Sequence, residues 1–205
     1  DGTKLFTVIF IPKDAKALPI LLERTPYNAG DFSTDAPHMR DAVRLSGREW
    51  ADDGYIVVYQ DIRGKYGSKG KYVMTRPPRG PLNPTDTDDT TDAYDTIDWL
   101  VKNLPQSNGK VGMIGSSYDG WTVTMALLGP HPALKAAIPE SPMTDGWMGD
   151  DWFHHGAFRQ NSLGYYSGQM AKTGKGEGLP FDGDDDYRNY LDAGSAGAVA
   201  ERFGF

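Results

Sequence analysis

The chain contains no cysteine among its 205 residues. Disulfides and thiolate metal sites are therefore excluded, and the redox compartment cannot be inferred from cysteine usage. No apolar run reaches the about 18 residues of a membrane-spanning helix, and no signal peptide is visible. We therefore expect no membrane as a partner, and the sequence itself indicates no compartment.

Basic residues are outnumbered, with 21 lysines and arginines against 28 aspartates and glutamates and a net charge of −7. This balance argues against nucleic acid as a partner and is compatible with a cationic substrate, although solubility alone also explains it. Hydrophobic residues make up 39% of the chain, which is ample for a core, and 25 glycines and 14 prolines predict many turns. The length suits one large domain or one and a half ordinary ones.

Residues 110–128, KVGMIGSSYDGWTVTMALL, combine a short apolar run, a sharp glycine- and serine-rich turn and a helix-compatible stretch. A serine on a tight turn between a strand and a helix is the pattern of the nucleophile elbow of α/β-hydrolases, so Ser117 is the predicted nucleophile. A bulky side chain at Gly115 would clash in this turn. The pattern is G-x-S-Y-x-G rather than G-x-S-x-G, because Asp119 precedes the second glycine, Gly120. The alternative is a turn that only packs a helix on a sheet.

Short apolar stretches alternate with amphipathic ones up to Glu140. Strands are predicted at residues 4–11, 18–24, 55–61, 110–114 and 134–139, and helices at residues 40–52, 92–103 and 121–128. From residue 55 onward the order is strand, helix, strand, helix, strand, which implies a parallel sheet. The predicted fold class is therefore α/β, an α/β-hydrolase fold with a mostly parallel sheet and flanking helices.

The composition changes beyond Glu140. Residues 141–160 are dense in aromatic and acidic side chains, and glycine-rich loops then alternate with short helical pieces. This segment is typical of an insertion over the carboxyl edge of the sheet. We predict that residues 1–142 are the N-terminal part of an α/β-hydrolase domain and that residues 143–205 begin an inserted helical cap.

Three loops contain candidate site residues or charged clusters. Tyr27 follows a buried strand and is predicted near its carboxyl end, the edge where α/β sheets bind ligands, although an ordinary loop aromatic is the alternative. Asp61 and Arg63 are interpreted as a buried pair that fixes a glycine-rich loop. The acidic residues 85–91 lack the ordered spacing of a calcium loop and suit the start of a helix. We expect neither a metal nor a cofactor.

Four segments carry a resemblance to a known family: RTPYNAG, QDIRGKYGSKGKYVMTRPPRGPLNP, GSSYDGWTVTMAL and ESPMTDGWMGDDWFHHGAFRQ. They resemble the α-amino acid ester hydrolases, which belong with the cocaine esterases and X-prolyl dipeptidyl aminopeptidases. Members of this group are much longer, with an α/β-hydrolase domain, an inserted helical cap and a C-terminal jelly roll. The resemblance implies that this chain is the N-terminal part only, so that its hydrolase fold is incomplete.

The resemblance also implies roles for four residues. Ser117 matches the family nucleophile, and the backbone N–H of Tyr118 would be one oxyanion donor. Tyr27 matches a tyrosine whose phenol supplies the second donor. Asp151, rather than Asp150, matches a member of an acidic cluster that binds the α-ammonium group of the substrate. A solvated acid is the alternative for Asp151.

The acid and the histidine of the triad are expected after residue 205, in the chain order Ser, Asp, His. His131 comes too early, between prolines directly after the elbow helix. His154 and His155 lie in the predicted cap, before any further strand of the sheet. We therefore expect these residues alone to lack the triad acid and histidine.

The function implied is a serine hydrolase or acyltransferase that acts on esters and amides of α-amino acids, including α-amino β-lactam antibiotics, through an acyl-enzyme. The alternatives are a cocaine-esterase-like carboxylesterase, an X-prolyl dipeptidyl aminopeptidase, or an inactive piece that serves binding or assembly. By the same resemblance we expect a homo-oligomer in the periplasm or secreted.

Overall fold

The computed structural model describes residues 1–32, 36–44, 47–149, 151–170, 173–174 and 186–203. The chain divides into two compact units, Asp1–Pro142 and Met143–Phe205. The first unit contains the sheet and the elbow, and the second contains Asp151. The assignment of the second unit to a helical cap stays a prediction.

A five-stranded sheet forms the centre of the first unit. Its strands are β1 (Thr7–Phe10), β2 (Leu18–Thr25), β3 (Ile56–Asp61), β4 (Ser107–Ser116) and β5 (Leu134–Glu140), in the order β1-β3-β2-β4-β5. Only β1 is antiparallel to its neighbour, and all other pairs are parallel. This arrangement confirms the predicted mostly parallel sheet and gathers the carboxyl ends of four strands at one edge.

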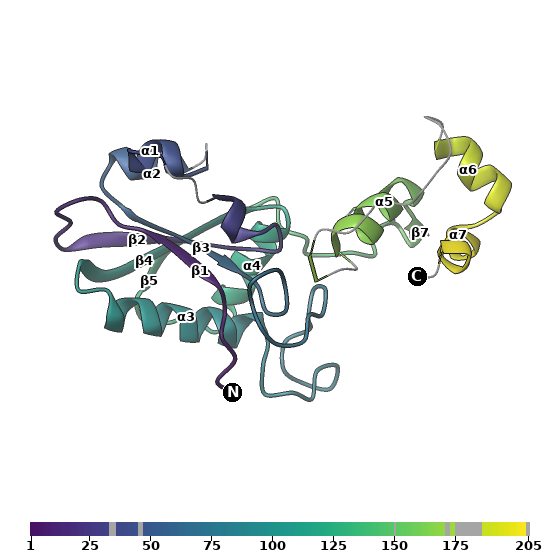
Figure 1. Ribbon diagram of the computed structural model, residues 1–205. Helices are drawn as coiled ribbons and strands as arrows, with labels where there is room; N and C mark the ends of the chain where they lie inside the picture. The colour runs from purple at the N-terminus through teal and green to yellow at the C-terminus, as the bar shows by residue number, and fades with distance from the viewer. Residues whose placement is uncertain (33–35, 45–46, 150, 171–172, 175–185, 204–205) are drawn as a thin grey trace. The chain divides into compact units, whose positions relative to one another are not determined.

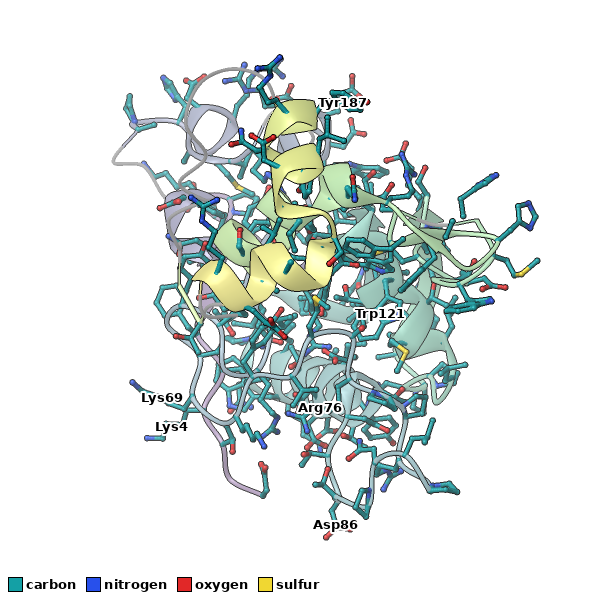
Figure 2. All side chains as sticks on the ribbon, turned by 90° about the vertical axis from the view of Figure 1, so that its right-hand side faces the viewer. Lys4, Lys69, Arg76, Asp86, Trp121 and Tyr187 are labelled. Carbon is teal, nitrogen blue, oxygen red and sulfur yellow. The ribbon has the colours of Figure 1, made fainter. Side chains whose placement is uncertain are left out.

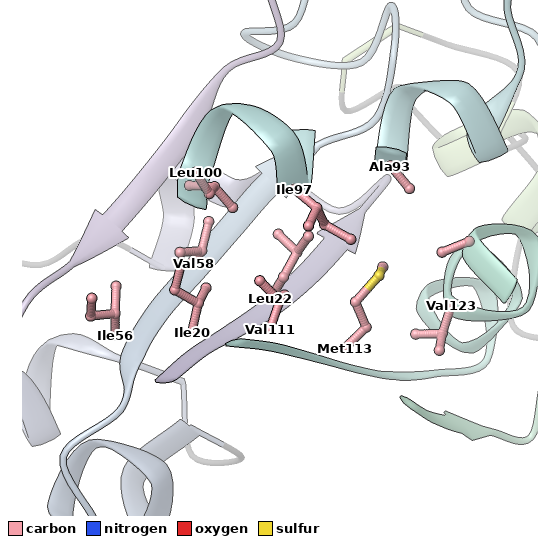
Figure 3. Packing of buried hydrophobic residues seen from close by; sticks show 11 residues of the cluster. Ile20, Leu22, Ile56, Val58, Ala93, Ile97, Leu100, Val111, Met113 and Val123 are labelled. Atoms are coloured by element: carbon pink, nitrogen blue, oxygen red, sulfur yellow. The ribbon is translucent and has the colours of Figure 1, made fainter. Parts of the chain in front are cut away.

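Helices cover both faces of the sheet. The helices α3 (Asp89–Asn103) and α4 (Tyr118–Leu127) pack on one face, and α1 (Met39–Ala42) and α2 (Arg48–Asp52) lie on the other (Figure 1). On the first face, Ile97 and Leu100 of α3 meet Ile20, Leu22 and Val58 of the strands (Figure 3). Each fully buried aliphatic side chain of this kind contributes about 1.5–3 kcal/mol to stability.

The predicted helix over residues 40–52 is wrong as a single helix. Helix α1 ends at Val43, whose backbone is extended with φ −90° and ψ 160°. Val43 is buried against Val57 and Tyr59 of β3, and a β-carbon at Gly47 would lie 2.6 Å from the Tyr59 hydroxyl. Tertiary packing therefore overrides the amphipathic pattern, and a second short helix begins at Arg48.

The acidic residues before α3 form a helix start, as predicted. Asp88 accepts a hydrogen bond from the Thr91 N–H at 2.8 Å, and the Thr91 hydroxyl accepts one from the Asp88 N–H at 3.0 Å. This capping box satisfies two backbone donors and starts the helix at Asp89, three residues before the predicted start.

The second unit contains short elements: β6 (Phe153–His154), β7 (Ala157–Phe158), the 3₁₀ turn η3 (Gln160–Ser162), α5 (Leu163–Tyr165), the π-helical turn η4 (Tyr166–Met170), α6 (Asp186–Ala193) and α7 (Ala196–Phe203). Trp152 is buried, and its ring centroid lies 4.0 Å from that of Tyr166. A separate small core joins Leu163, Tyr190 and Val199. In the described parts of the chain, no helix is long and apolar enough to cross a membrane.

Candidate active site

Ser117 lies at the turn between β4 and α4, where the sequence pattern places the nucleophile. Its backbone has φ 59° and ψ −119°, a left-handed conformation that a residue with a side chain rarely adopts. The Ser117 N–H donates to the Glu140 carbonyl at 3.0 Å, and the Trp121 N–H donates to the Ser117 carbonyl at 2.9 Å. The serine side chain is exposed. These contacts fix a strained turn that presents a hydroxyl to solvent, which is the geometry of a nucleophile elbow.

Two glycines make this turn sterically possible. A β-carbon at Gly115 would lie 2.5 Å from the backbone of Asp119, and one at Gly120 would lie 2.3 Å from the Glu140 carbonyl oxygen. Both distances are far inside van der Waals contact with backbone that has little freedom to move. The shift of the second glycine to Gly120 therefore has a physical reason, since that position packs on the end of β5.

Tyr118 begins helix α4, where the first backbone N–H groups have no acceptor within the helix. Such N–H groups point out of the helix start and stabilise negative charge. The side chain of Tyr118 is fully buried, and its ring centroid lies 5.2 Å from that of Trp121, which is labelled in Figure 2. The side chain thus anchors the residue while its amide stays at the turn beside Ser117.

Tyr27 follows β2 at the carboxyl edge of the sheet and is half-buried. Its N–H donates to the Thr25 hydroxyl at 3.1 Å, and Asn28 beside it adopts φ 73°. The loop is held from β3, because one carboxylate oxygen of Asp61 accepts from the Ala29 N–H at 2.7 Å. Parallel pairing of β2 with both β3 and β4 brings this loop to the same edge as Ser117.

The predicted Asp61–Arg63 pair is wrong. The second Asp61 oxygen accepts from the Gly67 N–H at 3.0 Å, so this carboxylate holds two loops by their backbones. Arg63 instead binds Asp92 of α3 with donor–acceptor distances of 2.9 and 2.5 Å, and also Asp1 at 2.7 Å. Backbone N–H groups thus satisfy the acid, and the arginine joins the loop to a helix. Burial is the largest influence on Asp61 and raises the pKa of its carboxyl, while the two N–H bonds lower it.

Two buried charged clusters below the site were not predicted. Arg24 of β2 has no exposed surface, and its guanidinium lies 3.4 Å from an oxygen of Asp89 and 3.9 Å from one of Asp92. On the other face of β2, Arg44 lies 2.6 Å from a Glu23 oxygen and 3.7 Å from one of Asp119. No local pattern links these partners, which come from separate elements.

The Asp119 carboxyl is buried directly behind the nucleophile turn. Burial raises its pKa well above the usual range, and the charge of Glu23 and a hydrogen bond with Glu23 raise it further. Its Oδ1 atom has no hydrogen-bond partner in the described part of the chain. A carboxyl in this setting keeps its proton to higher pH than an exposed aspartate.

Asp151, His154 and His155 belong to the second unit, and His131 belongs to the first. Asp151 is exposed in the second unit, where an Arg159 nitrogen lies 3.7 Å from its Oδ1 and the Ser162 hydroxyl donates to its carbonyl. Asp150 lies outside the described residues. His131 precedes β5 at its amino end, opposite the edge of Ser117, and its Nε2 lies 3.4 Å from Asp98. Among the described residues, no group of histidines and acids forms a metal site.

Comparison with known proteins supports the same interpretation. A family model described as X-Pro dipeptidyl-peptidase (S15 family) matches residues 1–202. The chain belongs to the S15 family. A solved α-amino acid ester hydrolase is 61% identical with a TM-score of 0.95, and the alignment covers 99% of this chain and 33% of that one. The predicted family and α/β-hydrolase fold are therefore confirmed.

Two other relatives of this S15 chain have different names. An aminopeptidase from Thaumarchaeota archaeon is 50% identical with a TM-score of 0.94, over 99% of this chain and 34% of that one. The cocaine esterase of Rhodococcus sp. (strain MB1 Bresler) is 30% identical over 148 residues, 71% of this chain and 22% of that protein. The chain thus spans about a third or less of the length of these relatives.

Proposed function

We propose that the protein is a serine hydrolase that acts on esters and amides of α-amino acids through an acyl-enzyme. The observation that carries the proposal is the backbone of Ser117, at φ 59° on a strand-to-helix turn with its side chain exposed. Strain of this kind persists only where the surrounding structure enforces it, and it gathers at active sites. The substrate class is supported by the 61% identity to the α-amino acid ester hydrolase.

In the proposed reaction, Ser117 Oγ attacks the acyl carbonyl carbon and gives its proton to a general base. The alcohol or amine then leaves, and water releases the acyl group. The Tyr118 N–H and the Tyr27 phenol stabilise the charge on the carbonyl oxygen. We assign the base to the protein outside the first unit, because His131 lies at the opposite end of β5.

Asp151 is proposed to hold the α-ammonium group of the substrate. The side chain of Asp151 is largely exposed, with an Arg159 nitrogen 3.7 Å from its Oδ1, and the net charge of −7 favours approach of a cation. β-Lactam antibiotics with an α-amino acyl side chain are amides that meet the same requirement. The proposal therefore includes their hydrolysis and the transfer of their acyl groups.

Replacement of Asp151 by Asn tests this role. A charge-assisted hydrogen bond contributes about 1.5–3 kcal/mol, roughly ten- to hundredfold in kcat/KM. We expect that loss for phenylglycine methyl ester and little change for phenylacetic acid methyl ester, which lacks the amino group. Asp192→Asn, an exposed acid on α6 of the same unit, is the matched control and should leave the ratio of the two values unchanged. An unchanged ratio in Asp151→Asn would make Asp151 a solvated acid.

A second candidate is an X-prolyl dipeptidyl aminopeptidase, which the family description and the aminopeptidase relative at 50% identity favour. A cocaine-esterase-like carboxylesterase is the third. The full-length protein should be assayed with phenylglycine methyl ester, an X-Pro anilide with a free amino terminus, and phenylacetic acid methyl ester. The substrate with the highest kcat/KM decides among the three candidates.

The nucleophile is tested by Ser117→Ala in the full-length protein, with Ser116→Ala as the control from the same exposed turn. Loss of a triad nucleophile lowers kcat by about 10⁶-fold. We expect that loss in Ser117→Ala with an unchanged circular dichroism spectrum, and near-normal turnover in Ser116→Ala. Normal turnover in Ser117→Ala would overturn the assignment. A wild-type protein without turnover on any of the three substrates would favour a binding or assembly role.

A further inference from the structure

The loop that carries Tyr27 is fixed on both sides by the end of β3. Before Tyr27, the Ile62 N–H donates to the Thr25 carbonyl at 3.0 Å, which continues the pairing of β2 with β3. After Tyr27, the Ala29 N–H donates to Asp61 Oδ1 at 2.7 Å. Thr25, Ala29 and Asp61 have no exposed surface. The backbone around Tyr27 is therefore tied to two consecutive residues of the sheet edge.

The Asp61 carboxylate satisfies a backbone donor that the loop itself leaves open. Ala29 begins the 3₁₀ turn η1 (Ala29–Phe32), and the first N–H groups of a helical turn have no acceptor within it. Asn28 directly before it adopts φ 73°, a conformation that needs support from its surroundings. A buried N–H without an acceptor is costly. The conformation of the segment after Tyr27 thus depends on the carboxylate of Asp61.

A second loop holds the same carboxylate in place. Asp61 Oδ2 accepts from the Gly67 N–H at 3.0 Å. The Ser68 hydroxyl donates to the Asp61 carbonyl at 2.7 Å and accepts from the Phe6 N–H at 2.8 Å. The Asp61 carboxylate cannot move with one loop without breaking its bond to the other. It is therefore a fixed reference point for the Tyr27 loop.

The Phe6 ring packs against both loops. A β-carbon at Gly67 would lie 2.6 Å from a ring carbon of Phe6, and a β-carbon at Gly30 would lie 3.7 Å from another. Gly30 belongs to η1, so the ring contacts the turn that Asp61 caps as well as the loop that holds Asp61. The two loops and the ring form one packed group beside Tyr27.

We propose that Asp61 is a positioning residue for Tyr27, and that its carboxylate, with the Thr25 hydroxyl, fixes the loop that directs the phenol at the substrate carbonyl oxygen. This inference rests on the proposed function. Asp61 is fully buried, so it acts through Tyr27 rather than on the substrate. A displacement of about 1 Å can cost 10²-fold in rate. Because oxyanion donors act mainly in the transition state, the loss falls on kcat.

Asp61→Asn in the full-length protein tests the inference, with phenylglycine methyl ester as substrate. The amide has one acceptor oxygen and places an NH₂ group against the second N–H donor. The bridge between the two loops is therefore broken whichever way the amide turns. We expect kcat to fall roughly tenfold with KM unchanged. Rates are taken per active site titrated with a fluorophosphonate, so that unfolded protein does not count.

Asp88→Asn is the matched control. Asp88 is a buried acid whose two oxygens also accept from backbone N–H groups. The donors are Thr91 at 2.8 Å and Arg79 at 2.9 Å, which belong to the start of α3 and to the loop before it. The same chemical change therefore removes a bond of the same kind outside the Tyr27 loop. Asp88→Asn should lower thermal stability about as much as Asp61→Asn and leave kcat unchanged.

A double-mutant cycle with Tyr27→Phe shows whether Asp61 acts through the phenol. Tyr27→Phe alone should lower kcat about 10²-fold, as for loss of one oxyanion donor. In that background Asp61→Asn should cost less than about twofold, because the group that it positions is gone. Equal losses in both backgrounds would overturn the inference. A loss in Asp61→Asn larger than that in Tyr27→Phe would also overturn it.

Thr25→Val is the second variant if Asp61→Asn gives no folded protein. It removes the hydroxyl that accepts from the Tyr27 N–H at 3.1 Å, whereas Thr25→Ser keeps that hydroxyl. We expect a fall in kcat of roughly tenfold in Thr25→Val and a near-normal kcat in Thr25→Ser. A normal kcat in Thr25→Val would overturn the inference.

Failure of the inference is distinguishable from failure of the proposed function. An active wild-type protein with a normal kcat in Asp61→Asn, or with a fall equal to that in Asp88→Asn, overturns the inference alone and gives Asp61 a purely structural role. A normal kcat in Tyr27→Phe overturns it too, while Ser117→Ala still tests the hydrolase. A wild-type protein with neither turnover nor an adduct on Ser117 overturns both.

Discussion

Strand β2 separates two charged clusters that differ in their ratio of arginines to carboxylates. On the α3 face, Arg24 lies between Asp89 and Asp92, and Arg63 also binds Asp92. On the other face, Glu23 and Asp119 lie beside Arg44. In the first cluster Asp92 lies beside two arginines, and Arg63 also binds the partly exposed Asp1. In the second, as far as the structure describes it, two acids share one arginine.

The free-energy cost of burying charge is therefore offset in different ways in the two clusters. Opposite charges compensate each other in the Arg24 cluster, although burial still raises the pKa of Asp89 against the influence of Arg24. In the Glu23 cluster the two carboxyl groups share Arg44, and burial, followed by the charge of Glu23, raises the pKa of the Asp119 carboxyl.

Arg24→Met should produce the largest effect on stability. The change removes the arginine beside the buried Asp89, while Asp92 keeps Arg63. Breaking a buried pair on one side costs about 3–5 kcal/mol. Hydrogen exchange of β2 peptides in the full-length protein measures the local free energy of opening. Unchanged exchange would show that the cluster contributes nothing to the sheet.

The exposed pair between Arg40 and Asp52 is the matched control, since both side chains are about half exposed. Surface pairs contribute about 0–1 kcal/mol. Arg40→Met should therefore change the exchange of β2 and of α2 within that range. A loss as large as that in Arg24→Met would remove the contrast between buried and exposed pairs.

Asp119→Asn should produce a smaller effect that grows with pH. The folded pKa of Asp119 is raised, so between the unfolded pKa and the folded pKa the folded state binds more protons. Wild-type stability therefore falls as pH rises through this window, by up to about 1.4 kcal/mol per pH unit. Asn cannot titrate. The free energy of opening of β2, measured by hydrogen exchange at equal pH, should therefore increase in the variant relative to the wild type as pH rises from 5.

Asp98→Asn is the control for the direction of the pH dependence of stability. Lys102 is the largest influence on Asp98 and lowers the pKa of its carboxyl. The ionised Asp98 carboxylate stabilises the fold above its unfolded pKa, and this stabilisation is lost as pH falls. The stability of Asp98→Asn should therefore not increase relative to the wild type above pH 5. An equal gain in stability relative to the wild type in both variants would contradict the raised pKa of Asp119.

The sequence predicted what depends on neighbours along the chain. The apolar run of β3, the capping residues before α3 and the serine between Gly115 and Gly120 are local patterns, and the structure agrees with each. The geometry of Ser117 follows from the same local turn.

What the sequence did not predict depends on partners distant along the chain. Asp61 and Arg63 are near in sequence. However, Asp61 accepts hydrogen bonds from the Ala29 and Gly67 N–H groups, and Arg63 donates to a residue of α3. Helix α1 ends where Val43 packs on β3. Asp119 likewise contacts Glu23 of β2 and Arg44 of the loop between α1 and α2. No regular spacing in the sequence predicts these contacts.

The central claim is that Ser117 is the nucleophile of the elbow. The most direct measurement is reaction of the full-length protein with a fluorophosphonate, followed by mass spectrometry of the peptide that contains Ser116 and Ser117. We predict a single adduct on Ser117, retained in Ser116→Ala and absent in Ser117→Ala. An adduct on Ser116, or an active protein that retains its label in Ser117→Ala, would contradict the claim.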